Sequence, residues 1–148
     1  MTPLQETVVR AASEWIGTPY LHQASVKGAG ADCLGLVRGV WRDVYGAEPE
    51  LVSPYTPDWS EPQGEEALWA AATRHLVPLP LDQVAPGDVL LFRMRDGQVA
   101  KHLGIVGAPE PVPTVIHAYS GHGVIESPLS EPWKRRIVAA FRLPETGA

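Results

Sequence analysis

The hydrophobic pattern of this sequence changes near Pro86 and Gly87, and this change limits the fold more than any other feature. Before it, apolar residues recur at helical spacing. After it, short segments rich in aliphatic and β-branched residues alternate with turn residues, at 88–94, 102–107, 114–119, 123–127 and 136–143. Helices first, then strands joined by hairpin-length connections, predict an α+β fold with N-terminal helices packed on an antiparallel β-sheet.

Two helices are expected in the first third of the chain. The first begins at a capping box formed by Thr2 and Gln5 and ends near Gly17. The second begins at Asp32, whose side chain can cap it, and ends at Gly46. The stretch between the two helices is predicted to be a loop, because glycine and proline mark both of its ends.

The region at about 47–80 interrupts the regular pattern. Four prolines lie between residues 47 and 64, where no clean periodicity is present, and a short helix is predicted at Glu65–His75. A chain of 148 residues is typical of one compact domain. We therefore predict a single domain over 1–148 with an irregular insert at about 47–80.

Charge and hydropathy exclude several classes of protein. The formal net charge is −5, and the longest run of Lys and Arg is 134–136, which argues against nucleic acid as a partner. No window of 18 consecutive apolar residues exists, so we expect no membrane span. The N-terminus lacks the basic and then apolar pattern of a signal peptide, which predicts synthesis in the cytoplasm.

Cys33 is the only cysteine, which excludes an internal disulfide and a Cys-rich zinc site. It follows the helix cap Asp32, so it would lie in the first helical turn, where free N–H groups and the helix dipole stabilise an anion. Such a position is expected to lower the pKa of the thiol and to favour the nucleophilic thiolate. The alternative is a small hydrophobic residue packed in the core.

His102 and His117 lie on two of the predicted strands. If these strands are neighbours, the two rings can meet, one as a base and one as its orienting partner, as in cysteine hydrolases. A metal site built from His102, His117 and His122 is the alternative, but it lacks a close-spaced ligand pair or a neighbouring carboxylate. We therefore expect no metal and no cofactor, and local structural roles for His22, His75 and His122.

Five motifs occur in the order found in the NlpC-family cell-wall peptidases, which this sequence resembles. They are GTPY at 17–20, ADCLGLVRGVW at 31–41, APGDVLLF at 85–92, KHLGIV at 101–106 and VIHAY at 115–119. The resemblance leaves the 47–80 region unmatched. It implies a papain-like fold, in which a helix presents a cysteine to an antiparallel sheet that carries the histidine.

The resemblance also implies roles for particular residues. Cys33 matches the nucleophile, His102 the base and His117 the residue that orients the base. Tyr20 matches a tyrosine beside the cysteine, and it is expected, with Asp32, to support the substrate or the oxyanion. The implied activity is that of a cysteine endopeptidase that hydrolyses amide bonds in peptidoglycan stem peptides.

The motif at the cysteine departs from the usual Asp-Cys-Ser-Gly, because Leu34 stands at the serine position. The variant DCLGLVRGVW resembles the branch encoded with the tail genes of phages and gene transfer agents. This branch implies incorporation in a phage-like tail, with tail hub or baseplate proteins as partners, and action at the periplasmic cell wall. Two alternatives remain: a structural tail-tip protein with a vestigial peptidase fold, and a papain-like amidase or acyltransferase with another substrate.

Overall fold

The computed structural model describes residues 1–50, 55 and 66–146. Its helices are α1 (Pro3–Ser13), α2 (Cys33–Tyr45), α3 (Ala67–His75), the 3-10 helix η2 (Leu81–Gln83) and α4 (Glu131–Lys134). Its strands are β1 (Ser25–Val26), β2 (Gly30–Ala31), β3 (Val77–Leu79), β4 (Val89–Arg93), β5 (Ala100–Val106), β6 (Thr114–Tyr119), β7 (Gly123–Pro128) and β8 (Ile137–Arg142). This set confirms the predicted α+β class.

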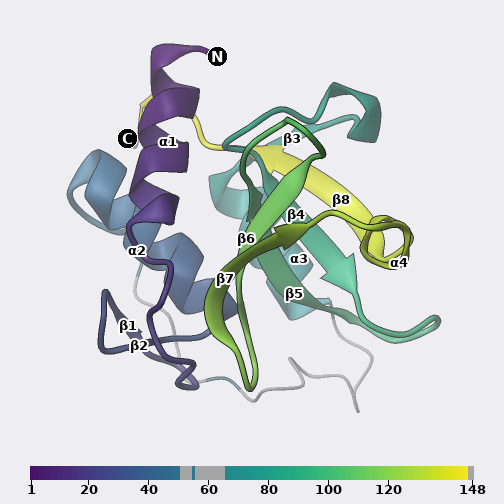
Figure 1. Cartoon of the computed structure of the whole chain (residues 1–148), viewed down its shortest axis with the longest axis horizontal. Helices are drawn as coiled ribbons and strands as arrows, with labels where there is room; N and C mark the ends of the chain where they lie inside the picture. The colour runs from purple at the N-terminus through teal and green to yellow at the C-terminus, as the bar shows by residue number, and fades with distance from the viewer. Residues whose placement is uncertain (51–54, 56–65, 147–148) are drawn as a thin grey trace.

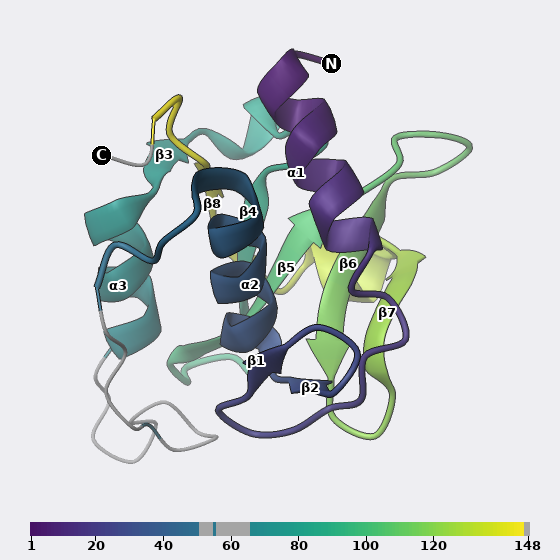
Figure 2. The same ribbon diagram turned by 90° about the vertical axis from the view of Figure 1, so that its left-hand side faces the viewer.

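A six-stranded antiparallel sheet in the order β3-β8-β4-β5-β6-β7 forms the centre of the molecule (Figure 1). Helices α1, α2 and α3 cover one face of this sheet, and Figure 2 shows them side by side in front of the strands. The short helix α4 lies away from these three helices and follows β7 in the chain. The predicted arrangement of N-terminal helices on an antiparallel sheet is therefore confirmed.

The side chains of the sheet alternate between two apolar cores. Val89 and Leu91 of β4 belong to the larger core beneath α1, α2 and α3. Leu90 and Phe92 belong to a smaller core on the opposite face, where Trp133 of α4 packs. Burial on both faces explains why the run 89–92 is apolar throughout instead of alternating with polar residues.

The two predicted helix starts have the expected caps. The Thr2 hydroxyl accepts from the Gln5 N–H at 3.1 Å, and the Gln5 side chain accepts from the Thr2 N–H at 2.8 Å. Asp32 Oδ1 accepts from the Gly35 N–H at 2.7 Å at the start of α2. Because these bonds satisfy backbone donors that a helix leaves free, they fix where α1 and α2 begin.

Two glycines allow α2 to approach its neighbours closely. A Cβ on Gly39 would lie 2.0 Å from Cζ2 of the buried Trp15, and one on Gly35 would lie 1.8 Å from the carbonyl oxygen of Ala24. Neither distance is possible for a larger residue. Gly39 therefore brings α2 against the end of α1, and Gly35 brings its first turn against the segment before Asp32.

The structure differs from the sequence prediction in its shortest elements. The predicted loop between α1 and α2 contains the small hairpin β1–β2, and α4 and β3 were not predicted. Each of these elements has four residues or fewer, too short for a periodic pattern to indicate them. Within the insert at 47–80, α3 agrees with the predicted helix at its C-terminal end, whereas residues 51–54 and 56–65 lie outside the described residues.

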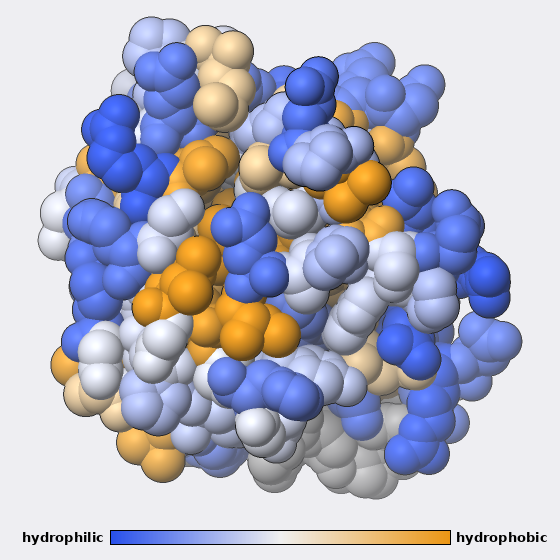
Figure 3. Space-filling view, in the orientation of Figure 1, coloured by the Kyte–Doolittle hydropathy of each residue, from blue (hydrophilic) through white to orange (hydrophobic). Residues whose placement is uncertain are grey.

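The surface is mixed in character. Figure 3 shows polar side chains over most of one face, with hydrophobic side chains gathered along the junction of α1 and the sheet. No helix among the described residues is long and apolar enough to cross a membrane.

Candidate active site

The sheet opens into a fork between β5 and β6. Within the described residues these strands pair through two positions, 105–106 with 115–116, whereas β5 pairs with β4 along the length of β4. The first half of β5 therefore turns backbone groups toward a gap instead of a strand. Helix α2 begins at this gap, where Cys33 Sγ donates to the Lys101 carbonyl oxygen at 3.8 Å.

His102 and His117 extend from the two arms of this fork and meet. His102 Nε2 and His117 Nδ1 are 2.8 Å apart. Trp133 packs against both rings, with ring centroids 5.6 Å from His102 and 5.0 Å from His117. The side chains of His102 and His117 are 7% and 1% exposed, so little water reaches the pair. The contact expected from neighbouring strands is present.

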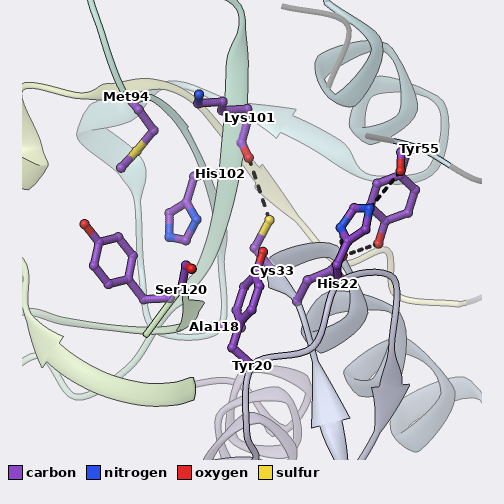
Figure 4. Close-up of a pocket in the computed structure, with 11 residues that line it drawn as sticks. Tyr20, His22, Cys33, Tyr55, Met94, Lys101, His102, Ala118 and Ser120 are labelled. Atoms are coloured by element: carbon purple, nitrogen blue, oxygen red, sulfur yellow. Dashed lines mark hydrogen bonds and ion pairs between the residues drawn. The ribbon is translucent and has the colours of Figure 1, made fainter. Parts of the chain in front are cut away.

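Cys33 and His102 line the same small pocket, whose volume is about 120 Å³ (Figure 4). In the part of the chain that the structure describes, the Cys33 thiol bonds to the Lys101 carbonyl and no hydrogen bond joins it to His102. Tyr20 lies beside Cys33, also in the pocket wall, as the sequence predicted. The pocket therefore brings the predicted nucleophile, base and neighbouring tyrosine to one opening.

The environment of Cys33 opposes a thiolate. The pKa of the thiol is raised to about 12, first by burial and then by the negative charge of Asp32. Backbone N–H groups of Leu103, Leu34 and Cys33 itself lower this pKa but are outweighed. The prediction that the helix N-terminus lowers the pKa of Cys33 is therefore wrong for the resting site, because burial dominates the helix end.

The two histidines are held neutral by the same burial. Burial lowers the pKa of His102 to about 3, with a smaller contribution from His117. Burial likewise lowers the pKa of His117 to about 4, with a smaller contribution from His122. At neutral pH the resting site consequently holds a neutral thiol and two neutral imidazoles, each with one protonated ring nitrogen.

Asp32 is the centre of a second network in the pocket wall. Its Oδ2 accepts from the Gln23 N–H at 2.7 Å and from the Tyr55 hydroxyl at 2.5 Å, while Oδ1 caps α2. His22 lies 3.6 Å from the same carboxylate and bonds to the Tyr55 carbonyl oxygen at 2.9 Å. With 3% of its surface exposed, Asp32 anchors the start of α2, and its contact with a substrate stays a prediction.

Tyr55 and Ser127 bond to predicted residues of the site but were not themselves predicted from the sequence. Tyr55 enters the pocket wall from the insert at 47–80, where no pattern indicates it. Ser127 bonds through Oγ to His117 Nε2 at 2.9 Å. A signal for Ser127 did exist, because it lies on the strand predicted at 123–127, next to the strand that carries His117.

The remaining histidines lie outside the His102–His117 pair. His75 pairs with Glu50 at 2.7 Å, and His122 stacks on Tyr119 with ring centroids 5.4 Å apart. The structural roles predicted for these residues agree with these contacts, although His22 also lines the pocket. No group of three His, Cys, Asp or Glu side chains among the described residues is arranged to hold a metal ion.

The sequence of this chain matches the model of a known protein family. The model of the NlpC/P60 family matches residues 17–142, a span that includes Cys33 and both paired histidines. The chain belongs to the NlpC/P60 family. The family resemblance stated from the sequence motifs is therefore confirmed, and the resemblance to a tail-associated branch stays a prediction.

Two curated relatives are similar over most of this chain. It is 27% identical over 130 residues to the probable endopeptidase NlpC of Escherichia coli, covering 87% of this chain and 71% of that protein. It is 31% identical over 137 residues to the gamma-DL-glutamyl hydrolase of Bacillus subtilis, covering 91% of this chain but 28% of that protein. The chain thus matches only a part of the second relative.

Solved structures show the same fold. An NlpC/P60 family protein of Bacillus cereus has a TM-score of 0.67 at 21% identity, with 97% of this chain and 42% of that chain covered. The NlpC/p60 domain of the peptidoglycan hydrolase SagA has a TM-score of 0.62 at 22% identity, with 94% and 98% covered. At these identities the likeness concerns the fold alone, and it agrees with the predicted papain-like, NlpC-type arrangement.

Proposed function

We propose that this protein is a cysteine endopeptidase that hydrolyses amide bonds in the stem peptides of peptidoglycan. The observation that carries the proposal is the pocket at the fork, which is lined by Cys33 and by His102, the ring that bonds to His117. The named activities of NlpC/P60 relatives support the same reaction class, because one is a probable endopeptidase and another a peptidoglycan hydrolase.

The reaction begins with a neutral pair. Because burial disfavours both the thiolate and the imidazolium, the proton leaves Cys33 as its sulfur attacks the substrate carbonyl, and Nδ1 of His102 receives it. Backbone N–H groups at the start of α2, including that of Cys33, stabilise the oxyanion that forms. In this reaction the helix end stabilises the charge of the intermediate and does not produce a resting thiolate.

The second half of the reaction returns the enzyme to its starting state. The His102 imidazolium donates its proton to the leaving amine, and the acyl group stays on Cys33 as a thioester. Water, deprotonated by His102, then attacks the thioester carbonyl, and the thiol leaves with the proton. His117 holds the ring of His102 throughout by the 2.8 Å hydrogen bond at Nε2.

Digestion of purified peptidoglycan tests the proposal. The protein should release soluble fragments whose masses, measured by mass spectrometry, correspond to cleavage within the stem peptide. Cys33→Ala is the matched control, because it removes the sulfur and leaves the rest of the pocket. Fragments released equally by both proteins would contradict the proposal.

A second substrate follows from the relative in Bacillus subtilis. The name of that protein, gamma-DL-glutamyl hydrolase, indicates an amide between glutamyl residues, and the chain is 31% identical to it. Hydrolysis of γ-linked glutamyl chains is therefore the alternative activity, and a digestion of such chains in parallel with peptidoglycan distinguishes the two. Release of glutamyl oligomers without release of muropeptides would favour this alternative.

We further propose that the protein acts at the periplasmic cell wall as part of a phage-like tail, bound to hub or baseplate proteins. The support is the motif DCLGLVRGVW, with Leu34 at the position usually held by serine. Mass spectrometry of purified particles from the producing cells tests this location. Peptides of this chain should co-purify with tail proteins, and their absence from intact particles would contradict it.

A further inference from the structure

Three side chains form a chain of hydrogen bonds behind the pocket. Ser127 Oγ lies 2.9 Å from His117 Nε2, and His117 Nδ1 lies 2.8 Å from His102 Nε2. The remaining ring nitrogen of His102, Nδ1, has no hydrogen-bond partner within the described part of the chain. It is the nitrogen left to receive the proton of Cys33.

The chain has two possible arrangements of its hydrogens, because each bond needs one hydrogen and each neutral imidazole carries one. In the first, His102 Nε2–H donates to His117, His117 Nε2–H donates to Ser127, and Nδ1 of His102 keeps its lone pair. In the second, Ser127 donates to His117, His117 Nδ1–H donates to His102, and the hydrogen of His102 lies on Nδ1. His102 can act as a base only in the first arrangement.

We propose that Ser127 is a positioning residue that accepts the Nε2–H of His117 and thereby keeps Nδ1 of His102 free as the base for Cys33. The inference rests on the proposed reaction at Cys33. A serine hydroxyl has two lone pairs and can accept this bond while its own hydrogen turns elsewhere.

Proton transfer to His102 requires the same arrangement. When the S–H bond of Cys33 breaks and an N–H bond forms at Nδ1, both nitrogens of His102 carry hydrogens. His117 must then accept at Nδ1, so its own hydrogen must lie on Nε2 and point to Ser127. With Ser127 as acceptor no other proton in the chain has to move during the transfer.

The register of the sheet explains why residue 127 has this role. His117 on β6 lies opposite Ile125 on β7, and Ser127 is two positions further along the same face, a diagonal neighbour. The adjacent Glu126 contacts Thr114 at 2.6 Å instead. Since His117 is 1% exposed, water does not replace the hydroxyl readily.

The first experiment measures the position of the proton directly. Long-range ¹H–¹⁵N correlation spectra of the wild type, with ¹⁵N-labelled histidine, distinguish protonated from unprotonated ring nitrogens at neutral pH. We expect the hydrogen on Nε2 of both His117 and His102. A hydrogen on Nδ1 of His117 would overturn the proposal.

The second experiment measures the reactivity of Cys33 with iodoacetamide, which needs no peptidoglycan. Ser127→Ala should slow alkylation by at least about tenfold, because Nδ1 of His102 is then no longer kept free to accept the proton of Cys33. Ser127→Thr should restore the alkylation rate. Ser130→Ala is the matched control, since Ser130 is exposed and its side chain makes no bond to the start of α4. Backbone amide spectra verify that each variant is folded.

The outcomes separate this proposal from the proposed function. An unchanged alkylation rate in Ser127→Ala, or the same loss in Ser130→Ala, would overturn the role of Ser127. If the wild type releases no peptidoglycan fragments while the alkylation and proton results are as expected, the substrate is wrong and the role of Ser127 stands.

Discussion

The buried histidine pair predicts that the protein loses stability when the pH falls from about 7.5 to about 5. The pKa values of His102 and His117 are lowered to about 3 and about 4, whereas an unfolded histidine has a pKa of about 6.5. In this window the two histidines bind protons in the unfolded chain but stay neutral in the folded chain. The contribution of these two histidines to the free energy of unfolding is complete above about pH 6.5, and it decreases as the pH falls below that value.

The size of this loss in stability follows from the pKa of histidine in the unfolded chain alone, because the pKa values of both histidines in the folded chain lie below pH 5. At pH 5 each histidine is about 1.5 pH units below its unfolded pKa, which corresponds to about 2 kcal/mol. His102 and His117 together should lower the free energy of unfolding by about 4 kcal/mol between these pH values. Carboxyl groups, which titrate near pH 4, contribute little above pH 5.

Urea unfolding, followed by circular dichroism at several pH values in this window, measures the effect. His117→Gln should remove about half of the pH dependence, and His75→Gln, which changes a histidine of α3 outside the pair, is the control. If Cys33 and His102 formed an ion pair at rest, His102 would already be charged. A free energy of unfolding that stays constant or rises toward pH 5 would therefore refute the neutral resting site.

Three substitutions test other parts of the structure. Trp133→Ala should lower the free energy of unfolding by about 2 to 4 kcal/mol. It should also weaken the pH dependence of this free energy, because water then reaches the two imidazoles, whose ring centroids lie 5.0 and 5.6 Å from that of Trp133. Gly39→Ala places a Cβ 2.0 Å from Trp15, and the overpacking should exceed the gain in helix propensity, with a net loss of about 1 to 2 kcal/mol in urea unfolding. Tyr55→Phe removes the 2.5 Å bond to Asp32, and urea unfolding should show a loss of about 1 to 2 kcal/mol.

Much of the fold was predictable because its elements are long enough to have a pattern. The capping box at Thr2, the cap at Asp32 and the change of hydrophobic period near Gly87 each indicate a structure through local chemistry. The elements that were missed, such as α4 at 131–134, have too few residues for periodicity. Their positions depend on tertiary contacts, such as the packing of Trp133 on the sheet.

The candidate site was predictable in its members but not in its protonation. The strand pattern brought His102 and His117 to the same face, and the helix cap located Cys33 in the first turn of α2. The pKa of Cys33 was predicted in the wrong direction, because the thiol is buried where α2 meets Lys101 of β5, which is far from the cysteine in the sequence. Long-range burial outweighs the local helix end, and a sequence pattern does not measure burial of this kind.

The role of Ser127 lies at the limit of what a sequence can indicate. Its contact with His117 requires the register of β6 and β7, which pairs His117 with Ile125. A shift by one residue would turn Ser127 to the other face of the sheet. The serine is thus recognisable as a partner only after the register is known.

The most direct test of the account is to trap the acyl group on the enzyme. Wild-type protein mixed with stem peptide and quenched in acid should show, by intact mass spectrometry, an added acyl fragment that maps to Cys33. Cys33→Ser should show no such thioester, and its hydrolysis should fall by up to about a millionfold. Full hydrolysis by Cys33→Ser, with no adduct at residue 33 of the wild type, would contradict a reaction through this thiol.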